Sequence, residues 1–208
     1  MSDVEAFKRV INYDNMDSSE LETLKKKLLL RQKTFQLKTL AQSNFLKFVK
    51  QVWPEFVEGP HHIKIAEKFQ DLAEGRINRL IVNMPPRHTK SEFASFLFPA
   101  WMMGRDPRLK IIQTTHTAEL SYRFGRKVRN LMEENVFQDV FDDIQLSQDS
   151  KAKGRWETNH GGEYFAAGVG GSITGRGADL LIIDDPHTEL LLVKELQMQP
   201  VLEIYLEN

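Results

Sequence analysis

Short apolar runs alternate with segments of helical periodicity along the middle of the chain, and this alternation constrains the fold more than any other feature. The runs are 79–84 (RLIVNM), 109–114 (LKIIQT), 163–168 (EYFAAG) and 180–185 (LLIIDD). Two intervening segments, 91–103 and 118–133, carry apolar residues at helical spacing. Buried strands that alternate with helices are typical of a parallel sheet covered by helices. We therefore predict an α/β fold with a parallel sheet flanked by helices.

Composition excludes several classes of protein. The 208 residues carry 28 Lys and Arg against 29 Asp and Glu, so the net charge of −1 gives no argument for nucleic-acid binding. Cysteine is absent, which excludes disulfides, thiol nucleophiles and Cys-based zinc sites. No apolar run approaches the roughly 20 residues that span a bilayer, and the acidic first twenty residues are unlike a signal peptide. We expect a soluble, cytoplasmic protein without a membrane segment.

Three parts of the chain differ in composition. Residues 1–41 combine an acidic lead-in with a basic segment of helical spacing, 42–188 contain the apolar runs, and 189–208 form a Leu-rich tail. The basic run Lys25-Lys26-Lys27 has two interpretations, a contact with DNA or a partner and a solvated helix face. The solvated face is the more common origin of such a run, and we favour it.

Lys90-Ser91 follows the loop PPRHT at the start of the predicted helix 91–103. A phosphate-binding loop needs a helix N-terminus, inward backbone N–H groups and a lysine that reaches the outer phosphates. Lys90 and Ser91 occupy the last two positions of the pattern G-x-x-x-x-G-K-[ST], but Met84 and Thr89 stand where that pattern has glycines. Taken alone, the segment is equally consistent with an ordinary turn that caps a helix.

Asp184 and Asp185 end an apolar run about 90 residues later. ATP hydrolysis requires one carboxylate near the Mg²⁺ shell and another that orients water. A central parallel strand delivers both at its C-terminal edge, where open α/β sheets bind ligands. A solvated turn after a buried strand is the alternative. The two elements together favour a nucleotide site.

Several motifs in order resemble the large terminase subunit of tailed bacteriophages. The run NMPPRHTKSEFASFLFPAWMMG (83–104) is similar to the variant Walker A segment of that family, which often has a Pro-Pro-Arg-His loop before Gly-Lys-Ser-Glu or Thr-Lys-Ser-Glu. GPHHIKIAEKF lies upstream, IIQTTHTAELSYRFGRKVRNLM follows the loop, and RWETNHGGEYFAAGVGGSITGRGADLLIIDDPH ends at the position of Walker B. The resemblance covers about residues 42–188 and implies a P-loop NTPase-like fold.

The resemblance also implies a role for each residue of the site. Lys90 binds the β- and γ-phosphates of ATP, while Ser91 and Asp184 hold Mg²⁺. Asp185 is the catalytic carboxylate, and Arg87 senses or stabilises the γ-phosphate. The nucleotide-binding segment comprises Pro86, Arg87, His88, Thr89, Lys90, Ser91 and Glu92. Thr89 departs from the glycine of the commonest loop. Residues 53–62 lie where the family has its adenine contacts, with no single residue assigned.

The function implied is that of the ATPase portion of a viral DNA-packaging motor. Such a motor couples ATP hydrolysis to translocation of double-stranded DNA into the procapsid, as a homo-oligomeric ring. Its partners are the portal protein and the small terminase subunit, and it works in the host cell cytoplasm. A non-hydrolysing nucleotide-binding or assembly module, derived from a truncated terminase, is the alternative.

The tail 189–208 does not resemble the family. Terminases continue with a strand that carries a coupling motif and then with a nuclease domain, for which about 50 residues or more are needed. We therefore expect a sheet that is incomplete at its C-terminal end, and no metal-dependent DNA cleavage by this chain. The Leu-rich tail either covers an exposed sheet or results from a truncated reading frame, and we favour truncation.

Other charged residues are weaker candidates. The basic residues of segment 118–133 provide either an arginine finger, a DNA contact or a solvated face; they are Arg123, Arg126, Lys127 and Arg129. Arg155 and Arg176 are candidate phosphate sensors. The histidines are not spaced as metal ligands, and we interpret them as polar or packing residues; they include His61, His62, His116 and His187.

Overall fold

A computed structural model describes residues 17–152, 154–173 and 175–187. The chain separates into two units, 1–40 and 41–208. The predicted tail 189–208 lies outside the described residues. In the described part of the chain, no helix combines the length and the apolar character that a membrane crossing requires.

The basic segment forms helix α2 (Ser18–Ser43), as its spacing predicts. Asp17 caps the N-terminus of this helix. Its carboxylate accepts hydrogen bonds from the backbone N–H groups of Ser19 and Glu20 at 2.7 and 2.9 Å, and the Glu20 carboxylate accepts the N–H of Asp17 at 3.0 Å. Each bond satisfies a backbone donor at or beside the first turn that has no partner within the helix.

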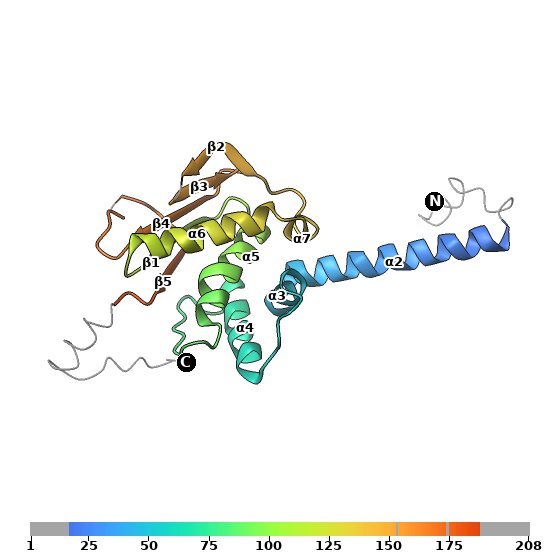
Figure 1. The fold of residues 1–208 in the computed structure, drawn as a ribbon, viewed down its shortest axis with the longest axis horizontal. Helices are drawn as coiled ribbons and strands as arrows, with labels where there is room; N and C mark the ends of the chain where they lie inside the picture. The colour runs from blue at the N-terminus through green and yellow to red at the C-terminus, as the bar shows by residue number, and fades with distance from the viewer. Residues whose placement is uncertain (1–16, 153, 174, 188–208) are drawn as a thin grey trace. The chain divides into compact units, whose positions relative to one another are not determined.

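The second unit is α/β, with a five-stranded mixed sheet flanked by helices (Figure 1). Its helical elements are α3 (Phe45–Val52), α4 (Pro60–Ala73), the π-helical segment η2 (Glu92–Leu97), α5 (Phe98–Arg105), α6 (Ala118–Glu133) and α7 (Asn135–Gln138). Its strands are β1 (Lys110–Thr115), β2 (Leu146–Ala152), β3 (Arg155–Thr158), β4 (Glu163–Gly168) and β5 (Leu180–Asp184). The predicted strands at 109–114, 163–168 and 180–185 and the predicted helix 118–133 are confirmed.

The strand order is β2-β3-β4-β1-β5, and the predicted all-parallel sheet is only partly correct. β1 is parallel to β4 and to β5, whereas β3 is antiparallel to both β2 and β4. Short connections join β2 to β3 and β3 to β4. Such connections produce hairpins, because a parallel pair requires a crossover of a dozen or more residues. The strand–helix pattern therefore describes β1, β4 and β5 but not β2 and β3.

The predicted strand 79–84 is wrong as a strand. Leu80 and Val82 pack against the core while Ile81 is half exposed, as in an extended segment. Its backbone, however, belongs to no ladder in the described sheet, where β5 is the edge strand. The alternation of apolar side chains specifies which of them face the core, but a strand also needs a neighbour with which to pair its backbone.

The core lies between the helices and one face of the sheet. Phe45 is fully buried at its centre, and its ring lies 5.5 Å from each of the rings of Phe69, Phe93, Phe98 and Trp101. Helix α6 approaches β4 closely at Gly125, where a Cβ atom would lie only 3.0 Å from the Tyr164 ring. The aromatic cluster is therefore built by α3, α4, η2 and α5, while α6 lies against the sheet at Tyr164.

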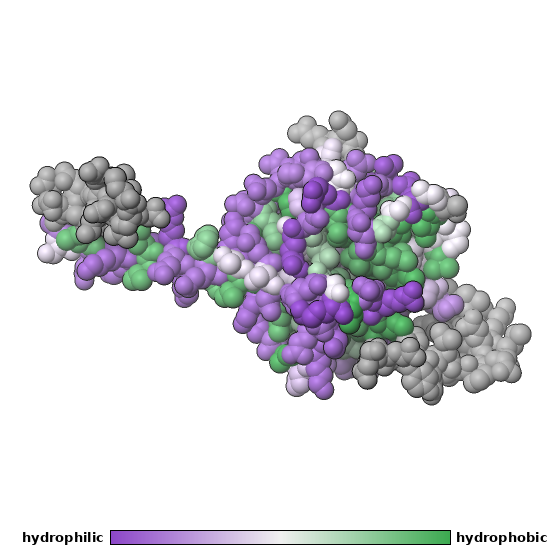
Figure 2. Space-filling view, turned by 180° about the vertical axis from the view of Figure 1, so that it is seen from behind, coloured by the Kyte–Doolittle hydropathy of each residue, from purple (hydrophilic) through white to green (hydrophobic). Residues whose placement is uncertain are grey.

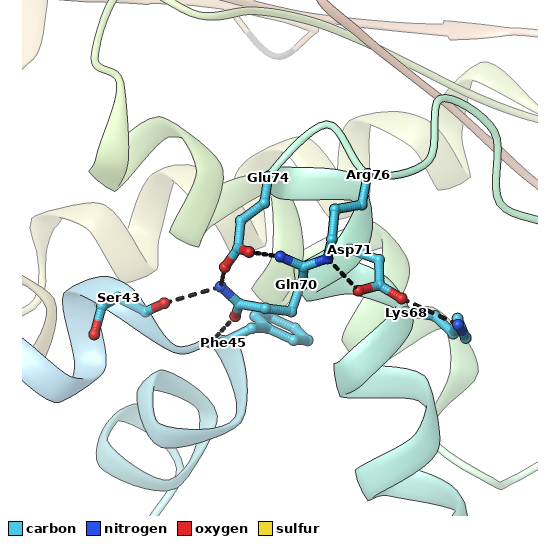
Figure 3. Close-up of polar contacts among 7 residues, drawn as sticks. All are labelled: Ser43, Phe45, Lys68, Gln70, Asp71, Glu74 and Arg76. Carbon is cyan, nitrogen blue, oxygen red and sulfur yellow. Dashed lines mark hydrogen bonds and ion pairs between the residues drawn. The ribbon is translucent and has the colours of Figure 1, made fainter.

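Polar contacts attach the C-terminal half of α4 to the start of α3 (Figure 3). The Gln70 side chain accepts the backbone N–H of Phe45 at 3.0 Å and donates to the carbonyl of Ser43 at 2.9 Å. Beside it, Asp71 pairs with Arg76 at 2.7 Å and with Lys68 at 3.0 Å. The Arg76 and Lys68 contacts lower the pKa of the Asp71 carboxyl. Helix α4 is thereby attached to the start of α3 through the half-buried Gln70 side chain.

The other face of the sheet is open at its edge strand β5. Leu181 and Ile183 of β5 are 56% and 59% exposed, and register places them beside Ile112 and Thr114 of β1. Hydrophobic residues also gather at the surface of the second unit in the view from behind (Figure 2). The β5 side chains of the opposite parity, Ile182 and Asp184, are buried on the helix-covered face.

Candidate functional site

Three parallel strands end at one edge of the sheet, where the sequence motifs meet. Thr115 at the end of β1 pairs in register with Gly168 at the end of β4 and with Asp184 at the end of β5. The helical segment that begins at Lys90 starts beside this edge. Parallel strands place their carboxyl ends together, so residues distant in the chain become neighbours here.

Lys90 faces both aspartates, as the motifs predict. Its Nζ atom lies 2.5 Å from Oδ1 of Asp185 and 3.9 Å from Oδ1 of Asp184. The Lys90 side chain is 24% exposed, whereas that of Asp185 is 62% exposed. The close pair is thus largely accessible to water, and such pairs contribute little to stability.

Asp184 is held in a different way. It is 7% exposed, and its Oδ2 atom accepts a hydrogen bond from the Ser95 hydroxyl at 2.8 Å. Ser95 itself is fully buried on η2. The sequence interpretation missed this residue, although a buried carboxylate at a strand end requires a donor, and a Ser four residues after Ser91 is a candidate for one.

The loop before the helix places its residues unequally. Pro86, Arg87 and His88 are exposed, while Thr89 and Lys90 are half-buried. The His88 ring contacts the Pro86 carbonyl oxygen through Nδ1 at 2.9 Å. Arg87 forms no ion pair with any residue that the structure describes. The loop thus presents a free guanidinium to solvent near the lysine.

Ser91 and Glu92 follow Lys90 and differ in their contacts. The Ser91 hydroxyl has no hydrogen-bond partner among the described residues. The Glu92 carboxylate is bound to Lys127 of α6 at 2.6 and 2.8 Å. Glu92, predicted as part of the nucleotide-binding segment, is therefore engaged with another helix, as is Lys127 from the basic set.

Backbone strain is concentrated at this edge. In the parts of the chain that the structure describes, the non-glycine residues with positive φ are Arg87 (64°), Thr89 (63°) and Asp185 (41°). All three lie in the loop or beside its lysine. Such residues are uncommon, and they persist only where surrounding contacts hold them, which occurs most often at functional sites.

A histidine buried behind the loop completes the site. The His62 ring is 7% exposed, and its Nε2 atom lies 2.7 Å from the Thr89 hydroxyl. Burial, followed by the neighbouring His61, lowers the pKa of His62, which favours the neutral ring. From the sequence, His62 is expected to be a polar or packing residue. Its position at the start of α4, 27 residues before the loop, gave no sign of this contact.

Two of the predicted phosphate sensors lie elsewhere. Arg155 and Arg176 each contact the Glu163 carboxylate at 2.9 Å, and Arg176 also lies over the Phe165 ring. Glu163 begins β4 whereas Gly168 ends it at the site, and five residue steps along a strand span about 17 Å. The structure therefore does not bring these arginines to Lys90.

The site contains a carboxylate that Ser95 holds in place, Asp184, and a lysine that pairs with the exposed Asp185. The lysine, Lys90, is the first residue of a helical segment. Among the described residues, no three His, Asp or Glu side chains are grouped as a metal site. Mg²⁺ in nucleotide sites, however, is held by one or two protein oxygens together with substrate phosphates. The Ser91 hydroxyl and the Asp184 carboxylate provide oxygen ligands of that kind.

Comparison of the chain with family models, with curated proteins and with solved structures gives no match.

Proposed function

We propose that this chain is a Mg²⁺-dependent ATP hydrolase of P-loop type, the ATPase portion of a viral DNA-packaging motor. The observation that carries the proposal is the meeting of Lys90 with Asp184 and Asp185 at the carboxyl edge of the sheet. Motifs 95 residues apart thus form one cluster, with the lysine at a helix start. A helix N-terminus and an adjacent lysine are the elements that bind phosphate groups.

The lysine can exchange its partner. Asp185 holds Lys90 through a pair that water reaches, so a triphosphate with greater negative charge can replace the carboxylate at little cost. Asp184 stays in place because Ser95 donates to it in a buried setting. Released from Lys90, the Asp185 carboxylate is free to orient a water molecule for attack on the γ-phosphate.

Ser91 and Asp184 are the residues that would hold Mg²⁺. Both present oxygen atoms, and the Ser91 hydroxyl has no competing hydrogen bond among the described residues. When bound, Mg²⁺ offsets the negative charge of the phosphates. Arg87 extends from the loop without an ion pair in the described chain, and we assign it to charge stabilisation at the γ-phosphate.

The motor function rests on the ordered resemblance of residues 42–188 to large terminase subunits. It implies double-stranded DNA, the portal protein and the small terminase subunit as partners, and a homo-oligomeric ring in the host cytoplasm. The exposed Arg123 and Arg126 on α6 are the basic residues available for DNA or a neighbouring subunit.

A second candidate is a nucleotide-binding or assembly module that does not hydrolyse ATP. It is favoured by the position of β5, which is the edge strand of the described sheet and carries the two aspartates. A catalytic strand with a neighbour on each side would hold Asp185 more firmly than an edge strand does. The two candidates share the binding site and differ in turnover.

Calorimetric titration of Mg-ATP and measurement of phosphate release test both candidates. Lys90→Ala removes a charged donor to the phosphates, and we expect a ten- to hundred-fold loss of affinity. Asp185→Asn retains the lysine, so binding persists while hydrolysis falls. Lys64→Ala is the control, since Lys64 is an exposed lysine on α4. Equal ATP affinity in all four proteins would exclude this loop as the phosphate site. Tight binding without phosphate release from the wild type would support the second candidate.

A further inference from the structure

Thr89 has a backbone conformation that its side chain disfavours. Its φ angle is 63°, in the left-handed region, where a β-branched residue is a clear outlier. In the pattern G-x-x-x-x-G-K-[ST] this position is a glycine, which adopts positive φ without steric cost. The chain therefore needs another source of stabilisation to keep the loop in this shape.

The Thr89 hydroxyl is hydrogen-bonded on both sides. It lies 2.7 Å from Nε2 of His62 and 2.6 Å from the carbonyl oxygen of His88. The Thr89 carbonyl accepts the backbone N–H of Phe93 at 3.0 Å, which closes the first helical turn after the loop. Thr89 is thus tied through its side chain to α4 and through its backbone to the helix that carries Lys90.

The His62 ring is fixed in one orientation and one tautomer. Its Nδ1 atom accepts the backbone N–H of Gly59 at 2.9 Å, so Nδ1 carries no proton in the neutral ring. The proton is therefore on Nε2, which donates to the Thr89 hydroxyl. Phe93 stacks on the ring at 5.4 Å, and Phe56 meets it edge-on at 4.8 Å. A ring held in this way places its N–H at a defined point behind the loop.

We propose that His62 is a positioning residue, which holds Thr89 in the left-handed conformation and so sets the position of Lys90 for phosphate. The inference rests on the proposed ATP site. His62 supplies through a side-chain hydrogen bond what glycine supplies through conformational freedom. It follows that the dependence on His62 exists only while residue 89 is a threonine.

A double-mutant cycle between the two positions tests this dependence. We expect His62→Phe, which keeps an aromatic ring but removes the donor, to weaken Mg-ATP binding about tenfold in calorimetry. Added to Thr89→Gly, the same substitution is expected to change affinity less than about twofold. A residue that stabilised the fold alone would give the same loss in both backgrounds, and that result would overturn the proposal.

Two further variants separate the hydrogen bond from packing. His62→Gln retains an N–H donor at the position of Nε2, and it should recover most of the affinity that His62→Phe loses. Thr89→Val removes the hydroxyl and keeps the β-branch, so it should reproduce the loss without any change to the core. His160→Phe is the matched control, because His160 is an exposed histidine whose ring contacts the Asp143 carbonyl and not the loop. A loss in the control equal to that in His62→Phe would overturn the proposal.

Backbone amide hydrogen exchange over residues 87–92 gives an answer that does not depend on ATP. We expect His62→Phe to speed exchange in this segment when Thr89 is present and to have no such effect in the Thr89→Gly background. Equal acceleration in both backgrounds would reject the positioning role. If exchange shows the coupling but neither Mg-ATP titration nor phosphate release responds to Lys90→Ala, the proposed function fails while the positioning of the loop stands.

Discussion

The hydrophobic core and the carboxyl edge of the sheet follow opposite rules. In the core, Phe45 and its aromatic neighbours are fully or almost fully buried, and none has a positive φ angle. At the edge, Arg87, Thr89 and Asp185 have positive φ angles, and the Lys90–Asp185 pair is accessible to solvent. Core residues therefore have the burial and backbone conformation that their residue types favour, whereas residues at the edge have conformations that their residue types disfavour.

The difference indicates where the stability of the fold is located. Burial of apolar side chains in the core stabilises the folded state, so truncation of these side chains lowers the free energy of unfolding. Residues of the edge contribute little net stability, because exposure screens their charges and strain opposes their contacts. Substitutions ordered from the core to the exposed edge should therefore show a decreasing effect on the free energy of unfolding.

Phe45→Ala should have the largest effect. Removal of a fully buried ring leaves a cavity among four aromatic neighbours, and we expect a loss of about 3–5 kcal/mol in the free energy of unfolding. Denaturant unfolding followed by tryptophan fluorescence measures it. Phe35→Ala is the control, since Phe35 is 68% exposed on α2 and should change stability by less than about 0.5 kcal/mol. Similar losses in the two variants would contradict the contrast.

Ser95→Ala lies at the boundary between the two regions. It leaves the buried Asp184 carboxylate without its donor, which should cost about 1–3 kcal/mol. The same denaturation experiment applies, with Ser172→Ala as an exposed serine control. The hydrogen bond would have no structural importance if Ser95→Ala were as stable as the control.

Acid should weaken the protein through His62. The pKa of the folded His62 is lowered from 6.5, chiefly by burial and by His61, with Glu58 acting in the opposite direction and His88 lowering it further. As the pH falls below 6.5, the ordinary pKa of histidine, His62 binds a proton in the unfolded chain but not in the folded chain. The free energy of unfolding therefore decreases over this range.

The check is denaturant unfolding from about pH 7.5 to about pH 5.5 for the wild type and for His62→Phe. The variant lacks the titrating group, so its stability should depend less on pH. If both proteins lose the same stability over this range, His62 does not titrate as its surroundings indicate.

Asp185→Asn should have the smallest effect on folding. Its side chain is 62% exposed, so loss of the pair with Lys90 should change the free energy of unfolding by at most about 0.5 kcal/mol. Under the proposed function, hydrolysis of ATP should nevertheless fall, because the carboxylate assigned to orient water is lost. A destabilisation as large as that of Ser95→Ala would show that the edge is part of the structural core.

Much of the fold was predictable because its elements are specified by local pattern. Helical spacing defined 118–133, and the apolar runs defined β1, β4 and β5 to within about one residue. The pattern failed at 79–84 and did not predict the antiparallel hairpins. Whether an extended segment pairs, and in which direction, depends on neighbours that the segment itself does not contain.

The candidate site also contains one contact that the sequence predicted and several that it did not. The residue types and order of the two motifs by themselves predicted that Lys90 would face the carboxylates of Asp184 and Asp185, and its Nζ atom lies 2.5 Å from Oδ1 of Asp185 although the segment 79–84 before the loop is not a strand of the sheet. Only the tertiary structure decided that Ser95 holds Asp184, that Lys127 binds Glu92, and that His62 supports Thr89. Each of these contacts joins segments 27 to 89 residues apart through one side-chain atom. Periodicity and motif spacing describe which face of an element a residue occupies, but a single hydrogen bond depends on the packing of whole elements against one another.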